Sequence, residues 1–263
     1  MTWFAGLPAG VLVAGWLAFT LVIAAVSRVA FRAIVPLDEH DHVFSISAPL
    51  MPALGATFAV LMALTLSSEA GYLRSAQDIV SLEAAAASRL AWASTSPGVD
   101  RQAVQGALAE YLHATREHEW HGTNATEGDD PEVAKKLAAL EHVVRAEAAK
   151  STLSTATTGE LLTALDTLSS ERRARIAAGS RTIPVLIIVT LVASGAALVV
   201  NGGALLIQST LRTSMLVVGL AVVVGLSLAL LFALTGPFDG PLIVSGRAID
   251  TVARDLRSGF FAP

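Results

Sequence analysis

The chain of 263 residues contains no cysteine. It can therefore form no disulfide, carry no thiol nucleophile and offer no thiolate to a metal ion. Charge is also scarce, because Asp, Glu, Lys and Arg make up only 15% of the residues and the formal net charge is -4. That balance provides no basic patch to neutralise a phosphate backbone, so we expect no nucleic-acid partner.

Apolar residues, by contrast, make up 53% of the chain and gather in long uncharged runs. A bilayer core about 30 Å thick needs about 20 helical residues to cross it. Four runs are long enough, and each must be helical because lipid cannot satisfy a bare backbone. They cover residues 7–26, 45–68, 183–200 and 215–234. Asn201-Gly202-Gly203 is expected to break the third run, and Pro184 to lie just inside its start.

The residues between the second and third runs are charged and rich in helix-forming side chains. We therefore predict an all-α membrane protein with four transmembrane helices and a helical cytoplasmic domain inserted between spans two and three. The expected boundaries are 1–68 for the first two spans, 69–182 for the helical domain, 183–235 for the last two spans and 236–263 for a C-terminal segment.

The orientation follows from arginines near the ends of the spans, which favour the cytoplasmic side. More of them flank the inserted domain and the C-terminal segment, including Arg74, Arg247 and Arg254, than lie in the two short loops. Arg28 and Arg32, in the first short loop, argue the other way. We expect a multi-pass protein of the plasma membrane with both termini and the helical domain in the cytoplasm.

Several helix boundaries can be predicted from capping and breaking residues. The second span continues without a break from Pro52 to Trp92 and ends at Ser96-Pro97-Gly98. Asp100 and Asp130 are predicted to cap the next two helices. A last helix starts near Thr158 and is expected to run into the third span.

The second span carries two stripes of residues with four-residue spacing. Gly55, Ala59 and Ala63 form a small-residue stripe, which favours close packing of another helix. The apolar stripe of Ala56, Val60 and Leu64 either faces lipid or lines a narrow hydrophobic constriction, and spacing alone leaves both open.

No motif indicates catalysis. The chain lacks a phosphate-binding glycine loop, a Gly-x-Ser-x-Gly turn and an H-E-x-x-H pair. His118 and His121 could share a helix face, but His113 faces elsewhere, so we expect no metal site. We expect no cofactor and no enzyme activity. The charged run at residues 171–175 is interpreted either as a solvated helix face or as a contact with anionic headgroups.

Four short motifs carry a family resemblance over nearly the whole chain. They are Tyr72-Leu73-Arg74, Glu83-Ala84-Ala85-Ala86, Glu119-Trp120 and Gly236-Pro237-Phe238-Asp239-Gly240-Pro241. In these motifs and in its order of spans, the chain resembles the bestrophin-like bacterial membrane proteins, which are similar to the bestrophin ion channels.

The resemblance implies a homo-oligomer, as in the pentameric bestrophins, in which the second span lines the pore. It places Ala56, Val60 and Leu64 at the apolar neck, where Leu64 replaces the larger aromatic ring of bestrophins. The acidic calcium clasp of animal bestrophins has no match here.

Two functional hypotheses remain. The first is a homo-oligomeric ion channel with an apolar neck, whose partners are the lipid bilayer, further copies of the chain and small ions. The second is a non-conducting membrane scaffold or sensor whose helical domain binds a protein partner.

Overall fold

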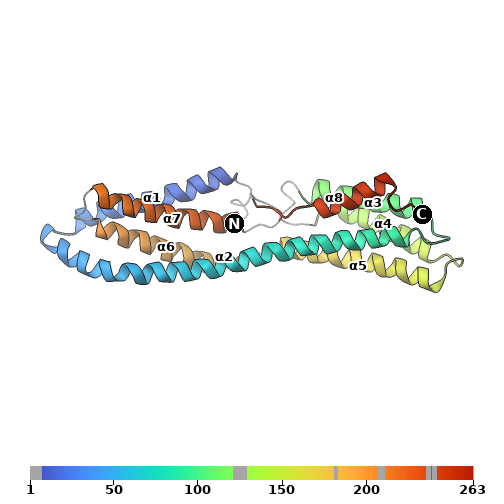
Figure 1. Cartoon of the computed structure of the whole chain (residues 1–263), viewed down its shortest axis with the longest axis horizontal. Coiled ribbons are helices and arrows are strands. Elements are labelled where there is room, and N and C mark those ends of the chain that lie inside the picture. The colour runs from blue at the N-terminus through green and yellow to red at the C-terminus, as the bar shows by residue number, and fades with distance from the viewer. Residues whose placement is uncertain are drawn as a thin grey trace. The chain divides into compact units, whose positions relative to one another are not determined.

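The computed structural model describes residues 8–120, 129–180, 183–206, 211–234, 238 and 242–262. Within these ranges the chain forms eight α-helices and a short 3-10 helix, η2 (Leu37–Glu39), and it contains no strand (Figure 1). The predicted all-α class is confirmed for this part of the chain.

Four of the helices are long and apolar enough to cross a membrane. They are α1 (Ala9–Ile34), α2 (His40–Ala93), α6 (Val185–Leu205) and α7 (Leu211–Ala233), of which Ser214–Ala233 forms the candidate span. The described residues therefore contain as many candidate spans as the sequence predicts. The expected break at Asn201-Gly202-Gly203 is wrong, because all three residues lie inside α6.

The contacts divide the chain into two units. Unit 1 comprises Met1–Gly71 and Thr182–Thr235, and unit 2 comprises Tyr72–Arg181 and Gly236–Pro263. Helix α2 contributes its first part to unit 1 and its last part to unit 2, as one α-helix of 54 residues. This confirms that the second span continues into the helical domain without a break.

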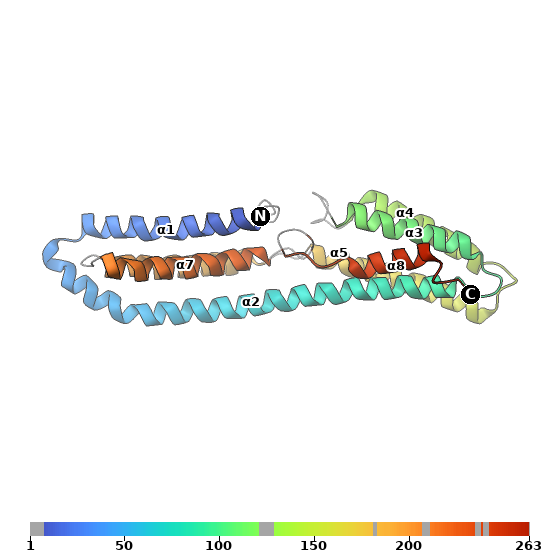
Figure 2. The ribbon, with the colours of Figure 1, turned by 45° about the horizontal axis from the view of Figure 1, so that its top comes forward.

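In unit 1, α1 packs along α7 and α6, as Figure 2 shows for α1 and α7. Glycine allows the close approach of α1 and α7. A Cβ atom added at Gly225 would lie 2.7 Å from Oγ1 of Thr20 and 3.2 Å from the carbonyl oxygen of Trp16. Such small-residue contacts bring helix backbones together where lipid supplies no hydrophobic driving force.

Replacing Gly225 with alanine should therefore destabilise unit 1. Because the new methyl group meets backbone as well as side-chain atoms, we expect a loss of about 1–3 kcal/mol, the usual cost of overpacking. Gly219→Ala is the matched control on the same helix, because a Cβ there meets nothing within 4 Å. Thermal unfolding of the detergent-solubilised variants checks this, and equal melting temperatures would contradict it.

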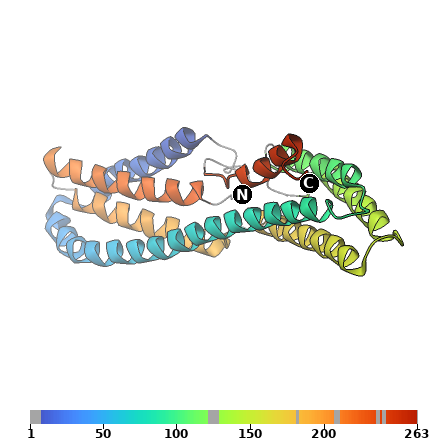
Figure 3. The ribbon, with the colours of Figure 1, turned by 45° about the vertical axis from the view of Figure 1, so that its right-hand side comes forward.

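Unit 2 joins the last part of α2 to four shorter helices (Figure 3). These are α3 (Arg101–His118), α4 (Pro131–Ala148), α5 (Thr155–Gly179) and α8 (Arg247–Ser258). Asp100 accepts a hydrogen bond from the Ala103 amide at 3.1 Å, and Asp130 accepts one from the Glu132 amide at 2.8 Å. Both predicted caps are confirmed.

The expected continuation of the last domain helix into the third span is wrong. Helix α5 ends at Gly179, and α6 starts at Val185 with Pro184 as its N-cap. Proline disfavours helical backbone in the residue before it, so a helix that included Pro184 in its interior would be strained.

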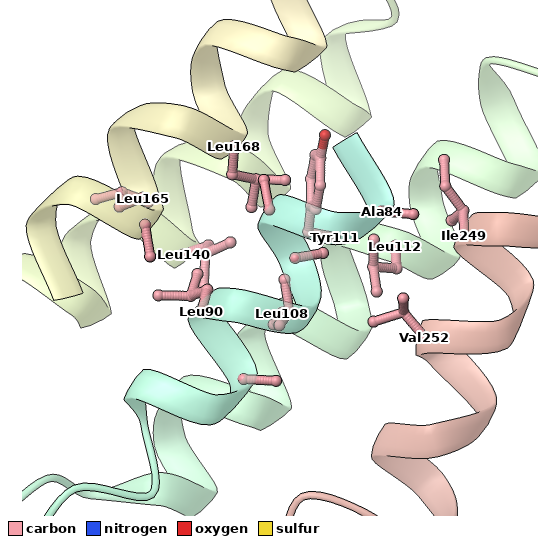
Figure 4. Close-up of a cluster of buried hydrophobic side chains, with 14 of the residues drawn as sticks. Ala84, Leu90, Leu108, Tyr111, Leu112, Leu140, Leu165, Leu168, Ile249 and Val252 are labelled. Carbon is pink, nitrogen blue, oxygen red and sulfur yellow. The ribbon is translucent and has the colours of Figure 1, made fainter. Parts of the chain in front are cut away.

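The core of unit 2 is apolar and continuous across its helices. Figure 4 shows Leu108 and Leu112 of α3 together with side chains of α2, α4 and α5, and with Ile249 and Val252 of α8. Leu108, Leu112 and Ile249 are fully buried. The C-terminal segment is therefore part of the same folded body as the inserted helices.

Candidate functional site

One face of the first part of α2 packs inside unit 1. Leu54, Phe58 and Met62 recur every four residues and join the apolar cluster that includes side chains of α6 and α7. Phe58 fits there because Gly195 has no side chain; a Cβ on Gly195 would lie 3.1 Å from the Phe58 ring. Helix α2 thus uses this face for contacts within its own chain.

The predicted neck residues lie on an exposed face of the same helix. Val60 is 58% exposed and Leu64 is 67% exposed, and Ala56 is exposed as well. Large apolar side chains at this density in a candidate span must be covered by lipid or by another chain. The apolar stripe is therefore available for contacts outside its own chain.

The small-residue stripe has a mixed environment. Gly55 is half-buried, and a Cβ added there would lie 4.0 Å from Leu198, whereas Ala59 and Ala63 are exposed. Within the chain, close packing is provided by the Phe58 face. The packing role of Gly55, Ala59 and Ala63 stays a prediction for contacts between copies.

A second site is a buried charge cluster in unit 2, formed by Glu83 of α2, Arg172 and Arg175 of α5, and Glu119 after α3. Nε of Arg175 donates to Glu83 at 2.5 Å, and its Nη2 donates to Glu119 at 2.6 Å. Nη2 of Arg172 donates to the other oxygen of Glu119, also at 2.6 Å. Two carboxylates and two guanidinium groups balance in charge, as burial of ions requires.

Tyr111 of α3 completes the charge cluster. Its hydroxyl donates to Glu83 at 2.5 Å. Burial, together with the negative charge of Glu83, raises the pKa of Tyr111 well above its usual value, so the phenol keeps its proton and remains a donor. Burial opposes the charge of Arg175, but Glu83 and Glu119 outweigh it and raise the pKa of this guanidinium.

Trp120 connects the charge cluster to the C-terminal segment. Its indole Nε1 donates to the carbonyl oxygen of Val244 at 3.1 Å, and its ring meets that of Phe238 edge-on at 5.4 Å between centroids. The guanidinium groups of Arg116 and Arg175 lie 5.0 and 5.2 Å from the Trp120 ring. These contacts hold Phe238 and Val244, which follow the last span in the chain, against Trp120.

Comparison with known proteins identifies the family. A family model described as a Bestrophin-like domain matches residues 11–249, which is most of the chain. This chain belongs to the Bestrophin-like family. The resemblance inferred from the motifs is thereby confirmed.

Solved structures show the same fold. A bacterial Bestrophin homolog from Klebsiella pneumoniae matches with a TM-score of 0.72 at 13% identity, covering 92% of this chain and 96% of that one. A mutant of this homolog gives a TM-score of 0.69 at 14% identity, over 93% and 99% of the two chains. A structure described as a membrane protein gives 0.72 at 12% identity, over 95% and 98%. No curated protein sequence matches the chain.

The motif residues of this Bestrophin-like chain fall into three groups. Glu83, Glu119, Trp120 and Phe238 are buried in unit 2, and the Tyr72 hydroxyl donates to the carbonyl oxygen of Ala178 in α5. Arg74 is exposed. Pro237, Asp239, Gly240 and Pro241 lie outside the described residues.

The partners of the motif carboxylates, Tyr111, Arg172 and Arg175, were not predicted from the sequence. The run at residues 171–175 was interpreted as a solvated helix face or as a contact with anionic headgroups. That interpretation is wrong for Arg172 and Arg175, which are only 5% and 2% exposed. Their burial could have been predicted from their spacing. Both arginines continue the buried stripe of α5 by steps of four and three residues from Leu168.

The part of the chain that the structure describes holds no group of three or more His, Cys, Asp or Glu side chains that could bind a metal ion. His113 instead lies 3.3 Å from Glu117 on the surface of α3. His121, the third member of that histidine group, lies outside the described residues. In the charge cluster each carboxylate meets a guanidinium, and of the cluster's described atoms Nε of Arg172 is buried without a hydrogen-bond partner. The arrangement is suited to holding the domain together.

Proposed function

We propose that this Bestrophin-like chain is the subunit of a homo-oligomeric ion channel, with five copies by family resemblance. The second span, α2, lines an apolar neck with Ala56, Val60 and Leu64. The helical domain, 69–182, forms a cytoplasmic vestibule together with the C-terminal segment, 236–263. Both termini lie in the cytoplasm, as the arginines flanking the domain favour.

The observation that carries this proposal is the exposed apolar face of α2. The helix is already anchored to its own chain through Phe58, so Val60 and Leu64 remain free to meet copies of themselves around an axis. Apolar constrictions conduct or block ions according to their width and wetting, so a neck needs no charged side chain. Membership of the Bestrophin-like family supports this arrangement.

The direct test combines imaging of the purified particle with current measurements in planar bilayers. A symmetric ring with α2 at its axis, and a current from the same preparation, are the expected results. A monomer, or a ring with α2 outermost, would contradict the proposal that α2 lines an apolar neck. A particle that passes no current but retains a stoichiometric protein partner would instead favour a membrane scaffold.

A further inference from the structure

The part of α2 that belongs to unit 2 has a buried face and an exposed face. Ala76, Val80 and Glu83 are buried in the core or in the charge cluster. Arg74, Asp78 and Arg89 are exposed. The charges on the outer face are therefore separate from those that stabilise the domain.

The spacing of these exposed residues continues that of the neck. An α-helix has 3.6 residues per turn, so residues eighteen apart share one side of the helix after five turns. Arg74 follows Ala56 by eighteen residues, and Asp78 follows Val60 by the same number. Arg89 lies about eight turns beyond Val60. Since α2 is one helix from His40 to Ala93, these residues share the helix side that carries the proposed neck.

Within the part of the chain that the structure describes, none of the three charges has an ion-pair partner. Among the described residues, no carboxylate lies within ion-pair distance of Arg74 or Arg89, and no basic group lies within that distance of Asp78. Each copy therefore presents two positive charges and one negative charge on this side of α2. In a ring of copies, each position becomes a layer of like charges.

We propose that Arg74, Asp78 and Arg89 are the selectivity-determining residues of the channel, with the arginine layers drawing in small inorganic anions and the Asp78 layer drawing in cations. This inference rests on the proposed function. The excess of one positive charge per copy makes anions the preferred ions. Rings of charged side chains act in this way because their field raises the local concentration of counter-ions.

The test is the reversal potential of the purified, full-length protein in planar bilayers under a potassium chloride gradient. Salt near 0.1 M keeps the screening length at about 10 Å, so that charges lining a pore still act on ions inside it. Arg89→Glu should lower the anion-to-cation permeability ratio at least about threefold, and Asp78→Asn should raise it.

Arg145→Glu is the matched control for Arg89→Glu, because Arg145 is an exposed arginine of α4, away from the side of α2 to which the selectivity is assigned, and undergoes the same change of charge. It should leave the permeability ratio at the wild-type value. Ratios for Arg89→Glu and Asp78→Asn that equal this control, or a wild type that prefers cations, would overturn the inference while leaving a conducting channel. A wild type without current would overturn the proposed function itself.

Discussion

Replacing Arg175 with methionine should lower the stability of unit 2 by about 3–5 kcal/mol, the usual cost of breaking a buried ion pair. Arg175 is the guanidinium that contacts both Glu83 and Glu119. Without it, Tyr111 and Arg172 are the side-chain partners that the two carboxylates keep among the described residues. Methionine preserves most of the side-chain length, so the loss reports the missing charge and hydrogen bonds rather than a large cavity.

Arg173→Met provides the control, because Arg173 lies on the same helix and is exposed. We expect this variant to melt within the range of neutral surface substitutions, about 0.5 kcal/mol. Thermal unfolding in detergent, followed by the far-ultraviolet helix signal, separates the two. If the two variants had the same melting temperature, the buried charge cluster would not be a source of stability.

Shortening Leu64 to alanine should increase the current of the proposed channel severalfold. Leu64 is 67% exposed in the single chain, so its removal opens the neck without creating a hole in the packed face around Phe58. An apolar neck that becomes wider is also easier to wet, and both effects act in the same direction. Val60→Ala should act similarly, with a smaller effect because fewer atoms are removed.

Leu186→Ala is the matched control for these measurements. Leu186, in α6, is also a leucine in a candidate span and is 80% exposed. It lies outside the apolar stripe of α2, so its replacement should leave the single-channel current unchanged. Equal currents from Leu64→Ala, Leu186→Ala and the wild type would mean that α2 does not line the narrowest part of the pore.

The helices could be predicted well from the sequence because their causes are local. Uninterrupted apolar runs predicted the four spans, and Asp100 and Asp130 predicted two helix starts. Boundaries that depend on neighbouring helices were less accurate. The sequence predicts that Asn201 ends a helix, but its side chain donates to the carbonyl oxygen of Ser47 in α2 at 3.0 Å, and α6 continues past it.

The charge cluster could be predicted only in part. The spacing of Arg172 and Arg175 after the buried leucines of α5 was visible in the sequence, and Glu83 likewise falls in the buried stripe of α2. What the sequence could not provide was the pairing, because Glu83 and Arg175 are 92 positions apart. Their contact depends on how α2 and α5 pack, and no local pattern encodes that.

The participation of α8 in the core of unit 2 has a consequence for how the protein is made. Ile249, Val252 and Phe261 are buried there, and they follow all four candidate spans in the chain. The inserted helices are synthesised long before them and must wait, with part of their apolar surface uncovered, until α6 and α7 have been translated. A chain that ended before α8 would therefore leave part of this apolar core uncovered, and proteases would find it open.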